Sequence, residues 1–289
     1  MKAEFKTIGI ISKFSDLSVG ASVTTLINFL LERGCNVVLD ESAAKTLPPS
    51  ELDTVDLARL GRRCDLAVVV GGDGTILHSA RALADADIPL VGVNLGRLGF
   101  LADILPDEMI EKLGEILDGH YFEERRFLLT THVERAGACV IEGYAFNDAV
   151  LHKWNSVRMI EFETRVDGQL VNCQRSDGII VSTPTGSTAY ALSGGGPILH
   201  PSMNAIALVP ICPHTLSNRP LVIDGGSVVE LIVNTGSQPH VRITLDGQDN
   251  FEVNDDDRIV IRRKDAPIRL IHPAGHDHFQ LLRAKLNWG

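Results

Sequence analysis

The sequence lacks the features that mark membrane proteins and nucleic-acid-binding proteins. No apolar run approaches the roughly 20 residues that a membrane-spanning helix needs. Basic residues are in deficit, with 27 Lys and Arg against 37 Asp and Glu and a formal net charge of −10. We therefore expect neither a membrane nor a nucleic acid among the partners of this protein.

Cysteine is scarce and scattered. The chain has five Cys residues and no Cys-x-x-Cys pair, which argues against a structural zinc site and against a disulfide framework. The first six residues include an acid and lead into a strand-like segment, so we expect no secretory signal. Reduced thiols and the absence of a leader predict a cytoplasmic protein. The cysteines are Cys35, Cys64, Cys139, Cys173 and Cys212.

The order of strand-like and helix-like segments divides the 289 residues into two domains. In residues 1–120, short apolar strands alternate with helices, including a weaker helix pattern over 51–60. This alternation predicts an α/β domain with a Rossmann-like parallel sheet. Residues 121–272 contain strands and hairpin turns but no convincing helix, and one long strand pattern covers 140–152. They predict an all-β, sandwich-like domain. Residues 273–289 regain helical spacing, and we expect a C-terminal helix that returns to the first domain.

A glycine-rich turn follows a buried strand pattern and opens a helix in the first domain. Glycines let the backbone approach phosphate oxygens closely, and a helix N-terminus offers free N–H groups. We interpret the turn as a phosphate loop in which Asp73 is a general base or a magnesium-associated group. The alternative is that Asp73 only caps the helix. The turn consists of Gly71, Gly72, Asp73, Gly74 and Thr75.

A second dense motif runs from Asp177 to Pro197, where a strand leads into a loop rich in hydroxyl groups and glycine. The hydroxyls have the chemistry to bind a sugar or a base edge, and Tyr190 offers a flat face for stacking on a purine. A merely solvated loop would not need the apolar residues that this loop carries, so we favour binding over a surface turn. The hydroxyl residues are Ser182, Thr183, Thr185, Ser187, Thr188 and Ser193.

Asn147 and Asp148 place an amide and a carboxylate inside an otherwise apolar strand pattern. Buried polar groups need partners. Recognition of a ribose, whose hydroxyls donate to a carboxylate, and a strand end satisfied by backbone groups are equally good explanations.

A few single residues give weaker signals. His78 lies about one helical turn past Asp73, although a structural histidine is the commoner case. Arg158 and Arg175 have the charge to meet a phosphate, although a solvated arginine is commoner. His276 and His278 alternate near the C-terminus, and no acidic or thiol partner that would make a metal site is apparent.

In order and spacing, these motifs resemble the NAD kinase family of the bacterial type. The resemblance covers nearly the whole chain, and its most specific element is the segment 184–190. The Gly-Gly-Asp-Gly-Thr element by itself is shared with diacylglycerol and sphingosine kinases. The residues that carry the resemblance are 71–75, Asn94, Leu95, Gly96, Gly99, Phe100, Leu101, Asn147, Asp148, Asp177, Gly178, 182–193, 245–248 and 281–286.

The resemblance implies transfer of the γ-phosphate of ATP to the 2′-hydroxyl of the adenosine ribose of NAD, giving NADP and ADP. It implies a divalent cation, Mg²⁺ or Mn²⁺, which we expect to be held mainly by the ATP phosphates, with no protein ligand assigned. It also implies a homodimer or a homotetramer.

Carried over residue by residue, the resemblance gives Asp73 the catalytic role. Position 148 is Asp where many family members have Glu, which shortens the reach of the side chain but keeps an acceptor. Arg175 resembles the form of the family that prefers NAD to NADH. The NAD-binding positions implied are Asp73, Gly74, His78, Asn147, Asp148, Arg158, Arg175, Asp177, Thr188, Ala189, Tyr190, Ala191, Leu192, Ser193 and Gln248.

Two other functions use the same features. A lipid kinase of the diacylglycerol type shares the glycine turn but needs an apolar cleft, for which the hydroxyl-rich loop is ill suited. A non-catalytic sensor of NAD or NADP would gain nothing from a carboxylate that faces phosphate.

Overall fold

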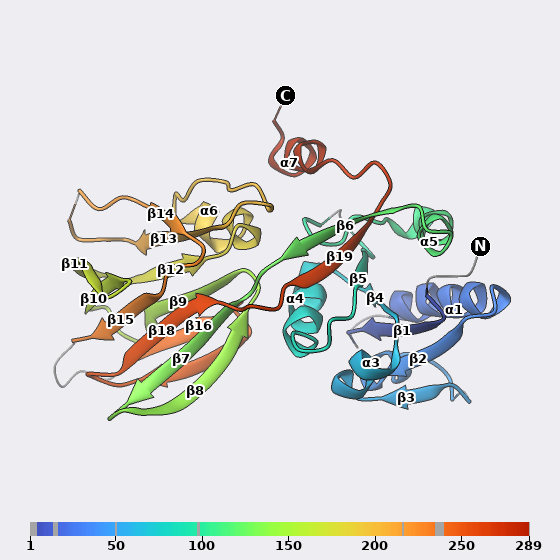
Figure 1. Ribbon diagram of the computed structural model, residues 1–289, viewed down its shortest axis with the longest axis horizontal. Coiled ribbons are helices and arrows are strands. Elements are labelled where there is room, and N and C mark those ends of the chain that lie inside the picture. Colours follow the sequence, from blue (N-terminus) through green and yellow to red (C-terminus); the bar gives the residue numbers. More distant parts are fainter. Residues whose placement is uncertain are drawn as a thin grey trace. The chain divides into compact units, whose positions relative to one another are not determined.

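The computed structural model describes residues 5–13, 17–49, 51–96, 99–215, 217–234 and 240–288. The chain forms two compact units (Figure 1). Unit 1 contains Met1–Arg125 and Ala266–Gly289, and unit 2 contains Arg126–Asp265. The domain boundaries expected from the sequence, near residues 120 and 272, lie close to the boundaries of these units. Over the described ranges, no helix combines the length and the apolar character needed to cross a membrane.

Unit 1 is built on a seven-stranded sheet with the strand order β3-β2-β1-β4-β5-β19-β6. The pairs β2–β3, β1–β2, β1–β4, β4–β5 and β5–β19 are parallel. This agrees with the Rossmann-like sheet that the sequence predicts. The strands are β1 (Thr7–Ser12), β2 (Asn36–Asp40), β3 (Asp53–Val55), β4 (Leu66–Val70), β5 (Leu90–Val93), β6 (Tyr121–Arg126) and β19 (Ile268–Pro273), and the helices are α1 (Leu17–Glu32), α2 (Glu41–Ala44), α3 (Leu57–Arg63), α4 (Asp73–Ala82), η1 (Pro106–Glu108), α5 (Met109–Leu117) and α7 (His278–Leu286).

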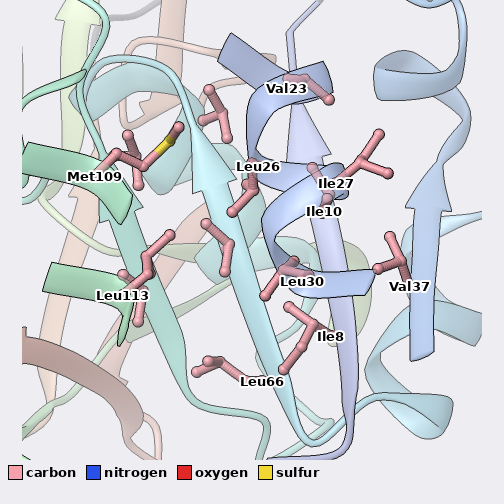
Figure 2. Close-up of a cluster of buried hydrophobic side chains, with 14 of the residues drawn as sticks. Ile8, Ile10, Val23, Leu26, Ile27, Leu30, Val37, Leu66, Met109 and Leu113 are labelled. Carbon is pink, nitrogen blue, oxygen red and sulfur yellow. The ribbon is translucent and has the colours of Figure 1, made fainter. Parts of the chain in front are cut away.

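Helices cover both faces of this sheet. Side chains of a strand point alternately to its two faces. Ile8 and Ile10 of β1 therefore pack on one side, with α1 and α5 (Figure 2). Gly9, which lies between them, approaches Leu60 of α3 on the other side so closely that a Cβ would clash with it. Helices on two faces make the sheet doubly wound.

The buried side of α1 packs into the core of unit 1. Figure 2 shows Val23, Leu26, Ile27 and Leu30 of α1 directed at the strands, with Met109 and Leu113 of α5 beside them. Apolar residues that recur at intervals of three and four residues form a stripe on one side of the helix, and this stripe packs on the sheet.

The strand order reverses direction between β1 and β4, which lie side by side with Ser12 opposite Val70. In doubly wound sheets, ligands bind at such a switch point, beyond the carboxyl ends of the strands. The glycine turn of residues 71–75 begins there, directly after β4.

The helix predicted over residues 51–60 is wrong in its first half. Asp53–Val55 pairs in parallel with β2 as an edge strand. The helix starts only after Asp56, whose side chain accepts a hydrogen bond from the backbone N–H of Arg59 and so caps α3. The strand β19 also joins the parallel sheet of unit 1, although the sequence predicts that residues up to 272 belong to the all-β domain. That helix, α7, is N-capped by Asp277 and lies in unit 1.

Unit 2 consists of two six-stranded sheets, in which all the described strand pairs are antiparallel. One sheet has the order β11-β10-β15-β18-β7-β8 and the other the order β14-β13-β12-β9-β16-β17. Their strands are β7 (Leu129–Arg135), β8 (Ala138–Ala145), β9 (Asp148–Lys153), β10 (Ile160–Val166), β11 (Gln169–Ser176), β12 (Gly178–Ser182), β13 (Ala205–Ile211), β14 (Leu221–Asp224), β15 (Val229–Val233), β16 (Val241–Leu245), β17 (Asp249–Val253) and β18 (Arg258–Arg263).

The inner faces of the two sheets share one apolar core, which confirms the predicted sandwich. A second, smaller cluster lies on the outer face of the β9-containing sheet, under residues 190–199. The hairpins predicted at Ala136-Gly137 and Asp167-Gly168 are present, and all four residues have positive φ. Such values match the two-residue turns that suit the twist of paired strands.

Two predictions for this region need correction. The strand expected over 140–152 is two strands, β8 and β9, because residues 146–147 leave the ladder between them. The region expected to be free of helix contains two single-turn helices, η2 (Thr185–Thr188) and α6 (Tyr190–Ser193). Four-residue helices are too short to form alone and leave little periodicity in a sequence.

Candidate active site

Unit 2 carries a cavity of about 490 Å³ on the outer face of the β9-containing sheet. Its volume lies within the range of small-molecule and cofactor sites. Polar groups from β9, the β12–α6 region and the β16–β17 turn converge on it. The lining residues are Asn147, Asp148, Val150, His152, Lys153, Asp177, Ala189, Tyr190, Ile211, Thr244, Asp246 and Gly247.

Strand alternation in β9 explains how one short segment supplies so much of the cavity wall. Ala149 and Leu151 point into the sandwich core. Asp148, Val150 and His152 therefore share the opposite face, which is the face of the cavity. The inward side chains of β9 thus hold the strand in the core, and its outward side chains are accessible from the cavity.

Asp246 fixes the entrance to β9. It lies in the tight turn between β16 and β17, where its φ is 52° and that of Gly247 is 66°. Its carboxylate accepts backbone hydrogen bonds from Phe146 at 2.9 Å, Asn147 at 2.8 Å and Asp148 at 3.1 Å. Phe146 and Asn147 lie between β8 and β9, outside the sheet ladder, and their N–H groups need acceptors. The turn therefore holds Asn147 and Asp148 in place at the cavity.

Asp148 is a buried carboxyl group beside this charged turn. Burial, followed by the negative charge of Asp246, raises its pKa from 3.8 to about 7. Near neutral pH the group is therefore poised between the acid and the carboxylate. Perturbed carboxyl groups in a cavity are typical of binding and catalytic sites.

Lys153 and His152 complete the polar wall. The Lys153 ammonium lies 2.7 Å from a carboxylate oxygen of Asp177, so the positive charge at the cavity is held in a fixed place. The Nε2 atom of His152 lies 2.8 Å from the hydroxyl oxygen of Thr244, and Nδ1 lies 2.9 Å from the Lys153 carbonyl oxygen. Contacts on both ring nitrogens set the orientation of the imidazole.

The motif that contains Tyr190 has two kinds of residue. Tyr190 lines the cavity and is 47% exposed, so its ring is available for stacking. Ala191 is fully buried in the smaller apolar cluster, and its side chain packs against the sheet.

Most of the buried hydroxyls of this motif bind the protein itself. Thr183 donates to the Phe146 carbonyl at 2.7 Å and accepts from the Gly186 N–H at 3.1 Å. Ser187 donates to the Pro184 carbonyl at 2.6 Å and accepts from the Leu199 N–H at 3.0 Å. These hydroxyls therefore tie the loop to the segment before β9, and their expected contact with a sugar stays a prediction.

The cavity brings together five of the residues singled out from the sequence, namely Asn147, Asp148, Asp177, Ala189 and Tyr190. Arg158 lies in an exposed turn, and Arg175 pairs with Glu161 at 2.8 Å on β11, in the other sheet. The remaining predicted residues of unit 2 do not line the cavity; they are Thr188, Ala191, Leu192, Ser193 and Gln248.

Several lining residues were not assigned to the site from the sequence. Thr244 becomes a neighbour of Val150 only through pairing of β16 with β9, nearly a hundred residues apart in the sequence. The pair Asp246-Gly247 could have been recognised as a hairpin turn, since Asp-Gly favours such turns. The remaining residues missed are Val150, His152, Lys153 and Ile211.

In unit 1, Asp73 is the first residue of α4 and does not cap it. The N-cap is Gly72, which makes no side-chain bond to the helix. The carboxylate of Asp73 instead accepts from the backbone N–H groups of Phe100 at 2.9 Å, Leu101 at 3.0 Å and Ala102 at 3.2 Å. Thus one glycine-rich segment of unit 1 is bound to the other through this side chain. The helix-capping alternative is excluded.

Gly72 and Gly74 leave room beside the backbone of the turn. A Cβ atom placed on Gly72 or Gly74 would have no heavy atom within 4 Å among the described residues. Thr75 is buried, and its side chain lies against Gly71. His78 is exposed on α4. An uncrowded glycine backbone at a helix N-terminus is suited to binding phosphate oxygens.

A doubly wound unit with a glycine turn at its switch point, and a sandwich unit with a polar cavity of cofactor size, are features of a nucleotide-binding enzyme. The sequence matches the ATP-NAD kinase N-terminal domain over residues 8–121 and the ATP-NAD kinase C-terminal domain over residues 146–273. The chain belongs to the NAD kinase family.

Individual relatives agree with this assignment. The NAD kinase of Nitrosococcus oceani is 48% identical over 289 residues, which cover 100% of this chain and 99% of that one. The NAD kinase of Pseudomonas entomophila is 49% identical over 286 residues, which cover 99% of this chain and 97% of that one.

Solved structures show the same fold. The yeast NADH kinase complexed with NADH matches with a TM-score of 0.90 and 26% identity, covering 100% of this chain and 89% of that one. The Archaeoglobus fulgidus NAD kinase in complex with ATP matches with a TM-score of 0.77 and 26% identity, covering 97% of this chain and 98% of that one.

The raised pKa of Asp148 predicts how stability depends on pH. Between about pH 4 and 7 the folded state keeps the proton that the unfolded state loses, so the free energy of unfolding falls as pH rises through this window. Asp148→Asn removes the ionisation, and should flatten this decrease by an amount on the order of a few kcal/mol.

Urea unfolding at several pH values measures this effect. Asp256→Asn is the matched control, because Asp256 is exposed in the same unit and its left-handed φ of 62° suits Asn. Identical pH profiles for Asp148→Asn and the wild type would show that Asp148 ionises normally.

Proposed function

We propose that the protein phosphorylates the 2′-hydroxyl of the adenosine ribose of NAD with ATP, releasing NADP and ADP, and that Asp73 is the general base. The observation that carries the proposal is the cavity of unit 2, where Asn147, Asp148 and Tyr190 converge in a member of the NAD kinase family. Amide and carboxyl groups suit ribose hydroxyls, and an exposed aromatic ring suits an adenine.

Family members with bound nucleotides support both substrates. The yeast relative is complexed with NADH, and the archaeal relative is in complex with ATP. In the proposal, the dinucleotide occupies the cavity of unit 2 and the phosphates of the donor bind the glycine turn of unit 1. Lys153 brings an ammonium group to the cavity wall, where it is paired with Asp177.

The hydrogen bonds of Asp73 are compatible with a role as base. A carboxylate offers about four lone-pair sites. The Oδ1 atom accepts from Leu101 and Ala102, whereas Oδ2 accepts only from Phe100 among the described residues. Oδ2 thus keeps an acceptor site for the proton of a sugar hydroxyl, and the three N–H groups fix the direction of the carboxylate. A hydroxyl is a poor nucleophile near neutral pH, so a positioned base is what the reaction needs.

The resemblance also implies Mg²⁺ or Mn²⁺, and the turn fits a cation that arrives with the nucleotide. The only carboxylate of the turn is Asp73, and its oxygens already accept three N–H groups. We therefore propose that the ATP phosphates hold the cation. Its contribution is to neutralise the charge of the transferring phosphoryl group.

We further propose a cytoplasmic location and a homodimer or homotetramer. Five single cysteines, none of them disulfide-bonded in the structure, suit a reducing compartment. The oligomeric state follows from the family resemblance alone.

A lipid kinase is a poorer explanation. The cavity wall contains the charged side chains of Asp148, Lys153, Asp177 and Asp246, and an acyl chain offers them no partner. A sensor without catalysis would need Asp73 only for its hydrogen bonds to residues 100–102 and would leave the remaining acceptor site of Oδ2 without a use.

The proposal predicts that the purified protein forms NADP from NAD, ATP and Mg²⁺, as read with an NADP-specific dehydrogenase. Omitting ATP or the metal should abolish the signal. Reactions with NADH in place of NAD, and with polyphosphate in place of ATP, define the acceptor and the donor. A folded protein that binds NAD without turnover would support the sensor. Phosphorylation of diacylglycerol in vesicles, without NAD binding, would support the lipid kinase.

Asp73→Asn should lower kcat by about 100-fold or more, because an amide cannot take the hydroxyl proton. NAD binding, measured by calorimetry, should be largely retained, since the cavity lies in unit 2. Asp107→Asn, an exposed aspartate of unit 1, is the control and should be as active as the wild type. Full activity of Asp73→Asn would remove Asp73 from the mechanism.

Tyr190→Ala should raise the KM for NAD more than it lowers kcat, because stacking stabilises the bound dinucleotide and the transition state alike. Tyr190→Phe keeps the ring and should behave like the wild type. A fall in kcat at constant KM would show that Tyr190 acts on the chemical step.

A further inference from the structure

A histidine–carboxylate cluster in unit 1 has no part in the phosphoryl transfer described above. Asp103 follows the segment bound by Asp73, His272 lies on β19, and His276 lies in the turn before α7. The sequence does not reveal Asp103 as a partner of His276, because the two residues are 173 positions apart. The fold brings them together, and the side chains of Asp103, His272 and His276 are only 11%, 1% and 8% exposed.

The two imidazoles converge on a single oxygen atom. Nδ1 of His272 and Nδ1 of His276 both lie 2.8 Å from Oδ2 of Asp103. The rings are stacked, with centroids 4.0 Å apart and an interplanar angle of 24°. One potential ligand atom from each residue lies within 4.8 Å of the other two. Two nitrogens and a carboxylate oxygen in one small volume are the donor set of a transition-metal ion.

Glu124 provides a second, independent observation. Its Oε2 atom lies 3.4 Å from Nε2 of His272, on the side of the ring away from Asp103, and its side chain is 12% exposed. Metal-binding histidines usually donate their second ring N–H to such a carboxylate, which orients the ring and strengthens the ligand. In addition, Oδ1 of Asp103 is buried and has no hydrogen-bond partner within the described part of the chain.

The cluster also borders open space. Asp103 and His276 line a cavity of about 380 Å³ in unit 1, together with Lys112, Asp277 and residues of α7. An ion held by three protein atoms at this edge would keep a coordination position for water.

We propose that Asp103, His272 and His276 bind one divalent transition-metal ion of the zinc class, with Glu124 as the carboxylate behind His272. Tetrahedral bonds of about 2.0–2.2 Å place ligand atoms roughly 3.3 Å apart, so the 2.8 Å contacts need to open by about half an ångström. Binding displaces the Nδ1 protons. The ion joins the C-terminal segment to residue 103 and is separate from the cation that accompanies ATP.

Metal titration of the full-length protein tests the proposal. The protein is stripped with a chelator and kept in excess Mg²⁺ without nucleotide, so that sites for hard cations are filled. Zn²⁺ is measured by competition with a chromophoric chelator, and Co²⁺ by its visible absorption. We expect one ion per chain, an absorption spectrum of low coordination number, and a higher melting temperature with Zn²⁺.

Four variants locate the ion, each checked for folding by thermal unfolding. His276→Gln and Asp103→Asn remove a ligand and should weaken Zn²⁺ binding by more than 10-fold. Glu124→Gln leaves the ligands in place and should weaken it by about 10- to 100-fold. His120→Gln changes an exposed histidine of the same unit and should bind Zn²⁺ like the wild type.

Two results would overturn the proposal. One is the absence of saturable, stoichiometric Zn²⁺ or Co²⁺ binding to the wild type, a measurement that does not depend on any variant. The other is binding that persists in His276→Gln and Glu124→Gln but disappears when the exposed thiols of Cys139, Cys173 and Cys212 are alkylated.

Discussion

Both functional regions depend on a carboxylate that gathers three consecutive backbone N–H groups. Asp73 accepts from residues 100–102 in unit 1, and Asp246 accepts from residues 146–148 in unit 2. In each case the three N–H groups need an acceptor, and hydrogen bonds to an ionised oxygen are stronger than those between neutral groups. Each carboxylate therefore fixes a loop to a glycine-containing turn. The same interaction that shapes the cavity also sets its electrostatics, because the charge of Asp246 adds to burial in raising the pKa of Asp148.

The buried hydroxyl groups of the Ser/Thr-rich motif make the loop rigid. Thr183 and Ser187 form hydrogen bonds with neighbouring backbone groups, so the loop that carries Tyr190 is held against the segment before β9. The ion pair of Lys153 with Asp177 likewise fixes a charge in advance of any ligand. A reaction that depends mainly on positioning gains from such preorganisation, since the groups do not have to be ordered again when substrate binds.

Much of the architecture was predictable because it depends on local patterns. The alternation of strands and helices, the glycine turn and the two-residue hairpins all follow from neighbouring residues. The predictions that were wrong involve longer range. The strand break at 146–147 results from bonds to Asp246, up to 100 residues further along the chain. The short helices at 185–193 rest on contacts with β12 and the segment at Leu199, and propensity alone does not reveal them.

The sequence by itself determined the fold class, the position of the glycine turn and five residues of the cavity, because these follow from periodicity, glycine content and polar residues in apolar strands. Only the tertiary structure decided the function of individual polar groups. His152 and Thr244 meet through strand pairing, Asp148 acquires its raised pKa from burial and then from the charge of Asp246, and Asp103 meets two histidines about 170 residues away. Electrostatic and hydrogen-bonding roles depend on distances of a few ångströms, and the folded chain alone sets those distances for residues far apart in the sequence.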